Sequence, residues 1–244
     1  ASGLRSTAVG CDNHVTGDFA SAFGYNCESY GLASLAVGFQ DNATGKEATA
    51  VGYQCNATGS RSTASGYQDI ASGDKSTAEG FNNRAAGTNS VAMGYDNGTT
   101  GTNSVSVGVN NNYQASTTSG DEGWGASATT TGDSSTAIGV SNTTTGDYSL
   151  AGGYNNTASA ADSTALGQNS TASAVNTVAI GNTASASAAN SIALGSNATA
   201  GTANSVALGS GSVTGTAHTD SAAQSITLKG TTYTFAGQAS ASAG

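Results

Sequence analysis

The chain has 244 residues, of which 9% are charged and 6% aromatic; it contains no proline and has a formal net charge of −9. Its six lysine and arginine residues cannot supply the concentrated basic surface that phosphate backbones need, which excludes nucleic acid as a partner. Disordered chains are usually rich in charge and proline, so this small-residue composition instead favours a repeat fold in which each segment stacks on a copy of itself.

Glycine recurs every fourteen residues. A second glycine, such as Gly3 or Gly17, lies seven residues before many of these main glycines. Seven residues are too few for a helix with a turn at each end, but they suit a short strand and a tight corner. The main glycines are Gly10, Gly24, Gly38, Gly52, Gly66, Gly80, Gly94 and Gly108 and, after one slip of three residues, Gly125, Gly139, Gly153, Gly167, Gly181, Gly195 and Gly209.

We therefore expect an all-β solenoid of two-strand coils, stacked in parallel and in register. Fifteen main glycines predict a rod on the order of 70 Å long at ~4.8 Å per rung. Gly-Asp pairs such as Gly17-Asp18 and Gly73-Asp74 are expected at one corner, where glycine would adopt positive φ and the aspartate would bond to its own backbone.

The strand before each main glycine is apolar on both faces. Alanine almost always stands two positions before the glycine, and a large apolar residue often stands one position before it. Because side chains alternate along a strand, alanine fits inside the coil and the large residues face outward, where other copies of the chain must cover them. The pattern does not decide between three copies and two. This predicted seam comprises Val9, Val37, Val51, Met93, Val107, Ile138, Leu166, Ile180, Leu194 and Leu208.

Three repeats interrupt the seam: Ser65 and Glu79 replace the large residue, and Gly152 omits it. A Glu79 layer repeated around an axis would be either a hydrated polar layer or an ion-binding layer. The second strand of each repeat alternates small apolar residues with polar ones, so one of its faces is expected to meet water.

Six successive repeats carry an aromatic residue directly after the main glycine. Rings stacked at rung spacing would stabilise a solenoid, each contact contributing about 0.2–1 kcal/mol. Exposed aromatic residues are also frequent binding anchors, which makes the same rings the candidate ligand-contact surface. This ring column comprises Tyr25, Phe39, Tyr53, Tyr67, Phe81 and Tyr95.

The spacing between Gly108 and Gly125 exceeds the repeat by three residues, which predicts an irregular loop rung over residues 109–125. Trp124 takes the position of Val or Ile in other repeats and is expected in the core. The loop before it is a secondary candidate for ligand contact, because solenoids accept insertions as outward loops.

The Ser-x-Ala-(Val/Ile/Leu)-Gly unit at fourteen-residue spacing resembles the YadA-like head of trimeric autotransporter adhesins, as at Ser34 to Gly38, Ser90 to Gly94 and Ser191 to Gly195. The resemblance covers residues 1–209. It implies a left-handed parallel β-roll, an intertwined or side-by-side homotrimer, and display on the outer membrane of a Gram-negative bacterium. Residues 210–244 leave the repeat and resemble the connector towards a neck, stalk and anchor that are expected outside this chain.

No pattern of catalytic or cofactor-binding residues is found, so we expect neither an enzyme nor a cofactor. Cys11 with His14 does not make a convergent four-ligand metal set. Cys27 and Cys55 would lie two rungs apart, about 9.5 Å at ~4.8 Å per rung, beyond the ~7 Å limit for a disulfide. Free cysteines are therefore expected.

The resemblance implies a non-enzymatic adhesin head that attaches bacteria to host extracellular matrix, cells or abiotic surfaces, and no insertion of this segment into a membrane. A trimeric phage or viral fibre that binds a host receptor is the alternative. An ice-binding solenoid is disfavoured because Thr alternates with Ala or Val, as in Thr49-Ala50-Val51, and a polysaccharide lyase is disfavoured because acids and bases do not cluster.

Overall fold

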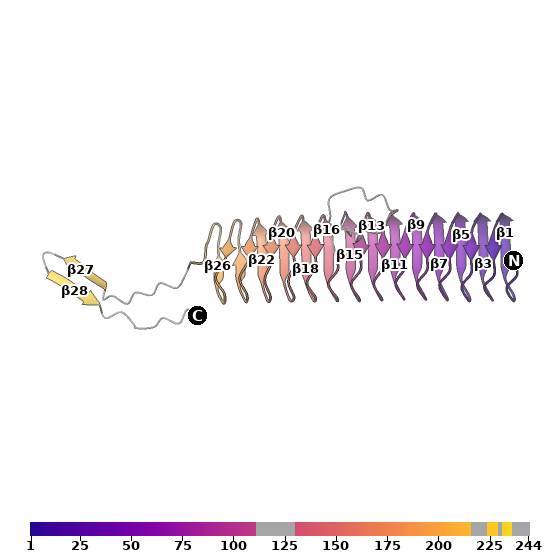
Figure 1. Ribbon diagram of the computed structural model, residues 1–244. Helices are drawn as coiled ribbons and strands as arrows, with labels where there is room; N and C mark the ends of the chain where they lie inside the picture. Colours follow the sequence, from indigo (N-terminus) through magenta and orange to yellow (C-terminus); the bar gives the residue numbers. More distant parts are fainter. Residues whose placement is uncertain (111–129, 216–223, 229–230, 236–244) are drawn as a thin grey trace, which may run out of the picture.

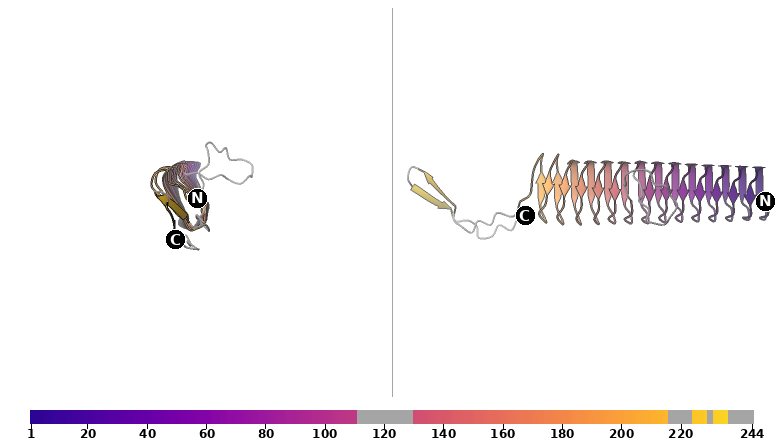
Figure 2. Two further views of the ribbon diagram at one scale, coloured as in Figure 1. Left: turned by 90° about the vertical axis from the view of Figure 1, so that its left-hand side faces the viewer. Right: turned by 45° about the horizontal axis from the view of Figure 1, so that its top comes forward.

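The computed structural model describes residues 1–110, 130–215, 224–228 and 231–235. Residues 1–110 and 130–215 form a parallel β-solenoid whose fourteen-residue turns, here called rungs, stack into a rod (Figure 1), which confirms the predicted all-β fold. Viewed along the rod, the rungs superimpose as one narrow coil (Figure 2). None of the described residues forms a helix that could cross a membrane.

One strand of every rung joins a fourteen-stranded parallel sheet, here called the first sheet. Each strand ends at the residue after the main glycine, except β24 and β26, which end at the residue before it. The strands are β1 (Thr7–Cys11), β3 (Ser21–Tyr25), β5 (Leu35–Phe39), β7 (Thr49–Tyr53), β9 (Thr63–Tyr67), β11 (Thr77–Phe81), β13 (Val91–Tyr95), β15 (Val105–Val109), β16 (Thr136–Val140), β18 (Leu150–Tyr154), β20 (Thr164–Gln168), β22 (Val178–Asn182), β24 (Ile192–Leu194) and β26 (Val206–Leu208).

The opposite side of the coil, the second sheet, consists of two-residue strands in a seven-stranded and a five-stranded part. Thr130 bridges Thr99 and Thr144 and so connects the two parts. The strands are β2 (His14–Val15), β4 (Glu28–Ser29), β6 (Asn42–Ala43), β8 (Asn56–Ala57), β10 (Ile70–Ala71), β12 (Arg84–Ala85), β14 (Gly98–Thr99), β17 (Thr143–Thr144), β19 (Thr157–Ala158), β21 (Thr171–Ala172), β23 (Ser185–Ala186) and β25 (Thr199–Ala200).

Residues fourteen apart in the sequence lie side by side in the first sheet, because successive strands pair in register. Ala36 pairs with Ala50, and Gly38 pairs with Gly52. Identical side chains therefore form columns along the rod, as the repeat predicts.

The prediction that Gly125 heads a rung between those of Gly108 and Gly139 was wrong. β15 pairs directly with β16, which places Gly108 beside Gly139. At the corner, a Cβ atom on Gly101 would lie 2.2 Å from the carbonyl oxygen of Gly132, so the same two rungs are adjacent there as well. The rungs of Gly108 and Gly139 are therefore neighbours on both sides of the coil. Most of the residues between them in the sequence, including Trp124, lie outside the described range.

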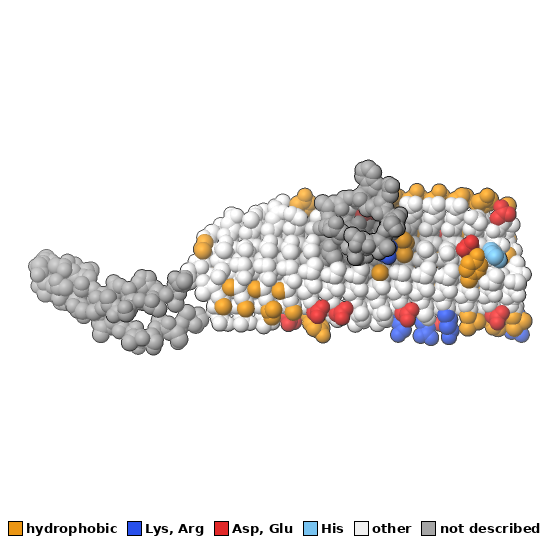
Figure 3. Space-filling view, in the orientation of Figure 1, with side chains coloured by type: hydrophobic (Ala, Val, Ile, Leu, Met, Phe, Trp, Pro, Cys, Tyr) orange, Lys and Arg blue, Asp and Glu red, His pale blue; other side chains and the backbone are white. Residues whose placement is uncertain are grey.

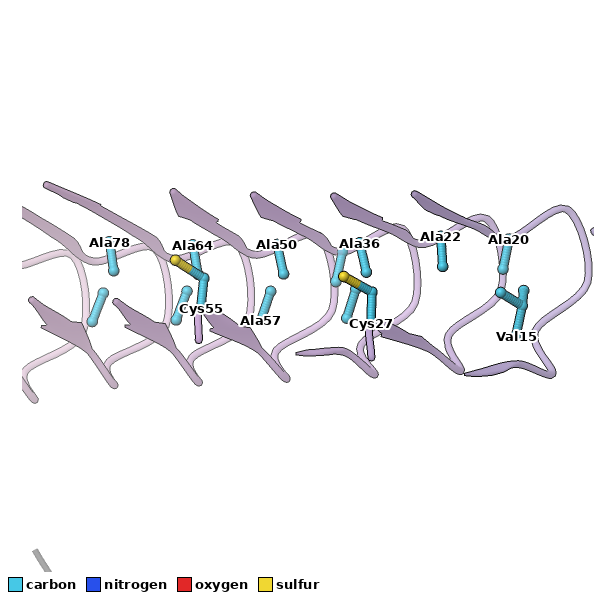
Figure 4. Packing of buried hydrophobic residues seen from close by; sticks show 14 of the residues in the cluster. Val15, Ala20, Ala22, Cys27, Ala36, Ala50, Cys55, Ala57, Ala64 and Ala78 are labelled. Atoms are coloured by element: carbon cyan, nitrogen blue, oxygen red, sulfur yellow. The ribbon is translucent and has the colours of Figure 1, made fainter. Parts of the chain in front are cut away.

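Small residues from both sheets fill the interior of the coil (Figure 4). Ala36 and Ala50 of the first sheet and Ala43 and Ala57 of the second are fully buried. The motif serine is also internal: Ser62 Oγ donates to the carbonyl oxygen three residues earlier at 2.7 Å. Small residues thus occupy most of the interior, with Val15 as a larger fully buried member, which confirms the inward placement of alanine.

The corner prediction was wrong in two respects. Gly73 does not have positive φ; the left-handed conformation belongs to Lys75, with φ of 57°. The Asp74 carboxylate accepts a hydrogen bond from the Ser60 backbone N–H of the preceding rung at 3.0 Å, not from its own backbone. Glycine is needed at this corner because a Cβ on Gly73 would lie 2.0 Å from the Gly87 carbonyl oxygen.

The solenoid is followed by an antiparallel hairpin of β27 (Gln224–Leu228) and β28 (Thr231–Phe235). This hairpin falls within the segment that the sequence separates from the repeats.

Candidate functional site

The seam residues lie on the outward face of the first sheet. Their register is continuous: Val37 pairs with Val51, Met93 with Val107, and Leu194 with Leu208. In the single chain Val9, Ile138 and Leu208 are 53%, 50% and 72% exposed. The other seam residues are exposed or half-buried, since each is flanked by the rungs above and below: Val37, Val51, Met93, Val107, Leu166, Ile180 and Leu194.

Glu79 and Gly152, two of the three residues that interrupt the seam, have different effects on it. Glu79 is exposed on the same face, paired with Ser65 and Met93, so a charged level interrupts the seam. Gly152 leaves no gap: a Cβ atom there would lie 2.8 Å from Cδ2 of Leu166, whose side chain leans over the glycine. Whether the Glu79 layer holds an ion depends on other copies and stays a prediction.

The ring column forms a continuous stack at the ends of β3 to β13. Neighbouring ring centroids lie 4.7–5.2 Å apart, with interplanar angles of 3° to 14°. Figure 3 shows a row of hydrophobic side chains along the corresponding upper edge of the rod. The stacked geometry agrees with the stabilising role that the rung spacing predicts.

Stacking limits which parts of the rings are exposed to a ligand. The terminal rings Tyr25 and Tyr95 are 45% and 46% exposed, whereas the four rings between them are 37–39% exposed. An inner ring has both faces covered by its neighbours, so only its edge reaches solvent. The column can therefore contact a partner with edges and phenol hydroxyls, and its role in ligand contact stays a prediction.

Charged residues gather at one corner beside the first sheet. Arg61 Nε lies 2.9 Å from Glu47 Oε2, and Lys46 Nζ lies 3.5 Å from Glu47 Oε1. The Arg61 guanidinium lowers the pKa of the Glu47 carboxyl below its ordinary value. All three side chains are more than 40% exposed, so this cluster is a solvated surface feature.

Sequence reasoning missed a buried column at the third position after the main glycines, which is polar in most rungs and alanine at Ala184 and Ala198. Its side-chain oxygens accept hydrogen bonds from the backbone N–H at the same position of the next rung. Asn83 Oδ1 accepts from Asn97 N at 3.1 Å, and Asp41 Oδ1 accepts from Cys55 N at 2.7 Å. The recurrence of Asn or Asp at this position was the available signal; the column includes Asp41, Asp69, Asn83, Asn97, Asn142 and Asn156.

Asp69 is a buried carboxyl in this column with one oxygen that lacks a hydrogen-bond partner. Its Oδ1 accepts bonds from both Asn83 N (2.7 Å) and Asn83 Nδ2 (2.9 Å), but its buried Oδ2 has no hydrogen-bond partner. Burial raises the pKa of the Asp69 carboxyl above its ordinary value of 3.8, although the bonds from Asn83 act in the opposite direction. Burial likewise raises the pKa of Asp41. The ionisable groups facing Asp69 are the Cys55 thiol and, one rung further, the Asp41 carboxyl.

Replacing Asp69 with asparagine is expected to stabilise the solenoid at neutral pH. A carboxyl whose pKa is higher in the folded state destabilises the fold once it ionises, so its penalty is absent below the ordinary pKa and grows as the pH rises through the folded-state pKa. An amide here would resemble Asn83, whose Nδ2 donates to the Glu79 and Gly94 carbonyl oxygens at 3.0 and 2.9 Å. We expect a gain of about 1–3 kcal/mol in the free energy of unfolding at pH 7.

Denaturant unfolding between pH 3 and pH 8 measures this gain. Asp74→Asn is the matched control, because it removes the same charge from an exposed corner. If Asp69→Asn gains no stability at pH 7, or gains equally at all pH values, the buried carboxyl is not the cause.

The three cysteines are free, as predicted: Cys27 and Cys55 are buried in the polar column, and Cys11 is exposed. Within the described residues no three His, Cys, Asp or Glu side chains converge as a metal site would require. The secondary contact candidate between Gly108 and Gly125 falls almost wholly outside the described residues.

A rod of two-strand rungs with small residues inside and a large apolar seam outside defines the class of parallel β-solenoids. A family model described as the YadA head domain repeat matches well over half of this chain, at residues 1–26, 43–68, 57–83, 71–97, 85–111, 123–139, 131–156, 158–184 and 186–212. The chain therefore belongs to the YadA head family, which is typically non-enzymatic and has an extracellular adhesin-like role. No curated protein matches it.

Proposed function

We propose that this chain is the adhesive head of a trimeric surface adhesin. The observation that supports this most strongly is the seam, a row of large apolar side chains on the outside of a rod whose interior is filled mostly by small residues. Contiguous apolar surface of this kind marks an interaction site. Heads of this family form homotrimers, which supports three copies arranged with their first sheets towards a common axis.

The proposed trimer is a passive adhesin. A stiff rod that repeats the same surface at every rung, in three copies, can add weak contacts by avidity. The family supports display outside the cell; attachment to the outer membrane of a Gram-negative bacterium, and to host extracellular matrix, cells or abiotic surfaces, is the specific form we propose.

Solid-phase binding tests this adhesive role. The purified protein, applied at one concentration to collagens, fibronectin, laminin and plastic, is expected to bind at least one surface above an albumin control. Tyr53→Ala combined with Tyr67→Ala is expected to weaken that binding at least tenfold if the ring column supplies the contact. The matched pair Thr58→Ala and Ser72→Ala alters two exposed positions beyond the second sheet.

Two outcomes are informative against the proposal. Unchanged binding by the ring variant would remove the ring column from the ligand contact while leaving the adhesin role intact. Failure of the unmodified protein to bind any of these surfaces would contradict the matrix- and surface-binding role itself.

A further inference from the structure

A tight turn forms the corner that precedes each strand of the first sheet, and its two tip residues stand six and five positions before the main glycine. In the rung of β9, for example, they are Ser60 and Arg61. The second tip residue has positive φ and is exposed in every described rung of the first sheet. Together the tip residues form a strip along one edge of the rod, here called the corner strip.

The chemical character of the corner strip changes along the rod in the order apolar, basic, uncharged, acidic and apolar. The first stretch holds Leu4, Phe19 and Leu32, which are 63%, 50% and 43% exposed, and its two charges, on Arg5 and Asp18, cancel. Along the lower edge of the rod, Figure 3 shows Lys and Arg side chains grouped in one stretch and Asp and Glu side chains in another. The basic stretch contains Lys46, Arg61 and Lys75, the uncharged stretch Thr88, Asn89, Thr102 and Asn103, the acidic stretch Asp133, Asp147 and Asp162, and the last stretch Val175, Ala189 and Ala203 next to asparagine residues.

The basic stretch is an exception on a chain whose formal net charge is −9. Its three cations outnumber the two carboxylates of Glu47 and Asp74, whereas the acidic stretch holds three carboxylates and no cation. Backbone groups hold two of those carboxylates in place: Asp133 Oδ1 accepts from Thr102 N at 2.7 Å, and Asp147 Oδ1 accepts from Asp133 N at 2.9 Å. The two stretches therefore have opposite net charge and lie at separate levels of the same edge.

An antiparallel copy of the rod complements this order. When the first rung of one copy is level with the last rung of the other, the rung of β7 faces that of β20, β9 faces β18, and β11 faces β16. Lys46 is then level with Asp162, Arg61 with Asp147, and Lys75 with Asp133. A shift of one rung in either direction loses one of these three pairs, and a parallel alignment places each cation beside itself.

The same register also matches the apolar stretches. The rung of β5 faces that of β22, which brings the exposed side chains of Leu32 and Val175 to one level. The uncharged rungs of β13 and β15 face each other at the centre. One antiparallel register thus satisfies both the charges and the apolar residues.

We propose that the corner strip is a self-complementary docking surface through which two rods associate side by side in antiparallel orientation. A twofold axis at right angles to the rod relates the two copies, so that each contact occurs twice. This contact differs from the seam, which faces sister copies within one assembly, because the corner strip joins rods of separate assemblies. It does not depend on the proposed trimer.

The contact is weak for a single pair of rods. Exposed ion pairs contribute little and are screened by salt. Fourteen rungs at ~4.8 Å and a strip about 7 Å wide give roughly 500 Å², below the ~800 Å² that each partner buries in a stable complex. At micromolar concentration and ordinary salt the rods therefore stay separate, and pairing is expected at high local concentration, where repeated contacts add.

Sedimentation velocity of the full chain at several hundred micromolar tests the role of charge. A species heavier than the parent assembly is expected at about 10 mM salt and not at about 500 mM. Lys46→Asp is expected to weaken this association about tenfold, because each rod pair then holds two like-charge contacts. Adding Asp162→Lys restores the opposite charges and is expected to restore the association; Asp162→Lys alone is expected to weaken it as Lys46→Asp does.

Cysteine cross-linking tests the register in the Cys11→Ser background. Leu32→Cys with Val175→Cys places thiols nine rungs, about 43 Å, apart in one chain, so only a second copy can bridge them. Mild oxidation at low salt is expected to link chains in this variant. Leu32→Cys alone and Leu32→Cys with Ala203→Cys, which is offset by two rungs, are expected to give little product.

Equal cross-linking by the level and offset pairs would overturn the proposed contact, as would a charge swap that does not restore association. Either result leaves the trimer untouched. If the unmodified chain is monomeric but the level pair still cross-links and the charge swap restores association, the corner strip contact stands and the proposed function fails.

Discussion

Gly52→Ala is expected to destabilise the solenoid by on the order of 3 kcal/mol per chain, or to prevent folding. Gly52 has φ of +138°, a region that residues with a side chain rarely adopt. A Cβ atom there would also lie 2.0 Å from the Gly66 carbonyl oxygen in the next rung. The backbone of two rungs would have to separate, because the obstructing atom belongs to the main chain.

Gly152→Ala is the matched control for this prediction. Gly152 also lies in a first-sheet strand, but it lacks positive φ, and the nearest atom to its added Cβ is the flexible end of the Leu166 side chain. Thermal unfolding followed by circular dichroism should show a large loss for Gly52→Ala and a loss below about 1 kcal/mol for Gly152→Ala. Equal melting temperatures would contradict the close backbone approach at the main glycine.

Introducing a charge into the seam is expected to dissociate the assembly without unfolding the chain. In Val37→Asp with Val51→Asp, two adjacent half-buried positions of the outward face would carry carboxylates. Covering these carboxylates with sister copies would cost several kcal/mol in desolvation, and the like charges would be repeated around the axis. Because both side chains face outward, the interior alanines and the ladder pairing stay intact.

Sedimentation velocity measures this effect, with circular dichroism as the check on folding. Thr44→Asp with Thr58→Asp is the control, because it adds the same charge beside the second sheet in neighbouring rungs. The seam variant is expected to sediment as a folded monomer and the control as the parent does. A seam variant with unchanged sedimentation would show that this face is not covered.

The repeat made most of the architecture predictable. A glycine every fourteen residues sets the register, because each main glycine must lie beside the next one, as Gly38 lies beside Gly52. Alternation along a short strand then places Ala36 inside and Val37 outside. The same register stacks Tyr53 on Tyr67 with centroids 4.9 Å apart, which the sequence spacing alone anticipates.

Features that depend on contacts between rungs were not predictable. Asp74 accepts its hydrogen bond from Ser60, fourteen residues away, so local turn chemistry gave the wrong partner. The burial of Asn83 and Asp69 could not be predicted for the same reason. At their position the backbone leaves the β-sheet, and the N–H of the next rung bonds to the side-chain oxygen of Asn83 or Asp69 instead. The glycine spacing predicted that Gly125 would follow Gly108 in the stack, but Gly108 pairs directly with Gly139.

Sedimentation equilibrium of the unmodified chain at micromolar concentration probes the buried-seam claim most directly. If sister copies cover the apolar outer face, the protein should have three times the single-chain mass of 23.4 kDa, with no monomer at the lowest loading. A folded, soluble species of 23.4 kDa would show that Val37, Val51 and their neighbours face water, which would contradict the assembly on which the proposed adhesin rests.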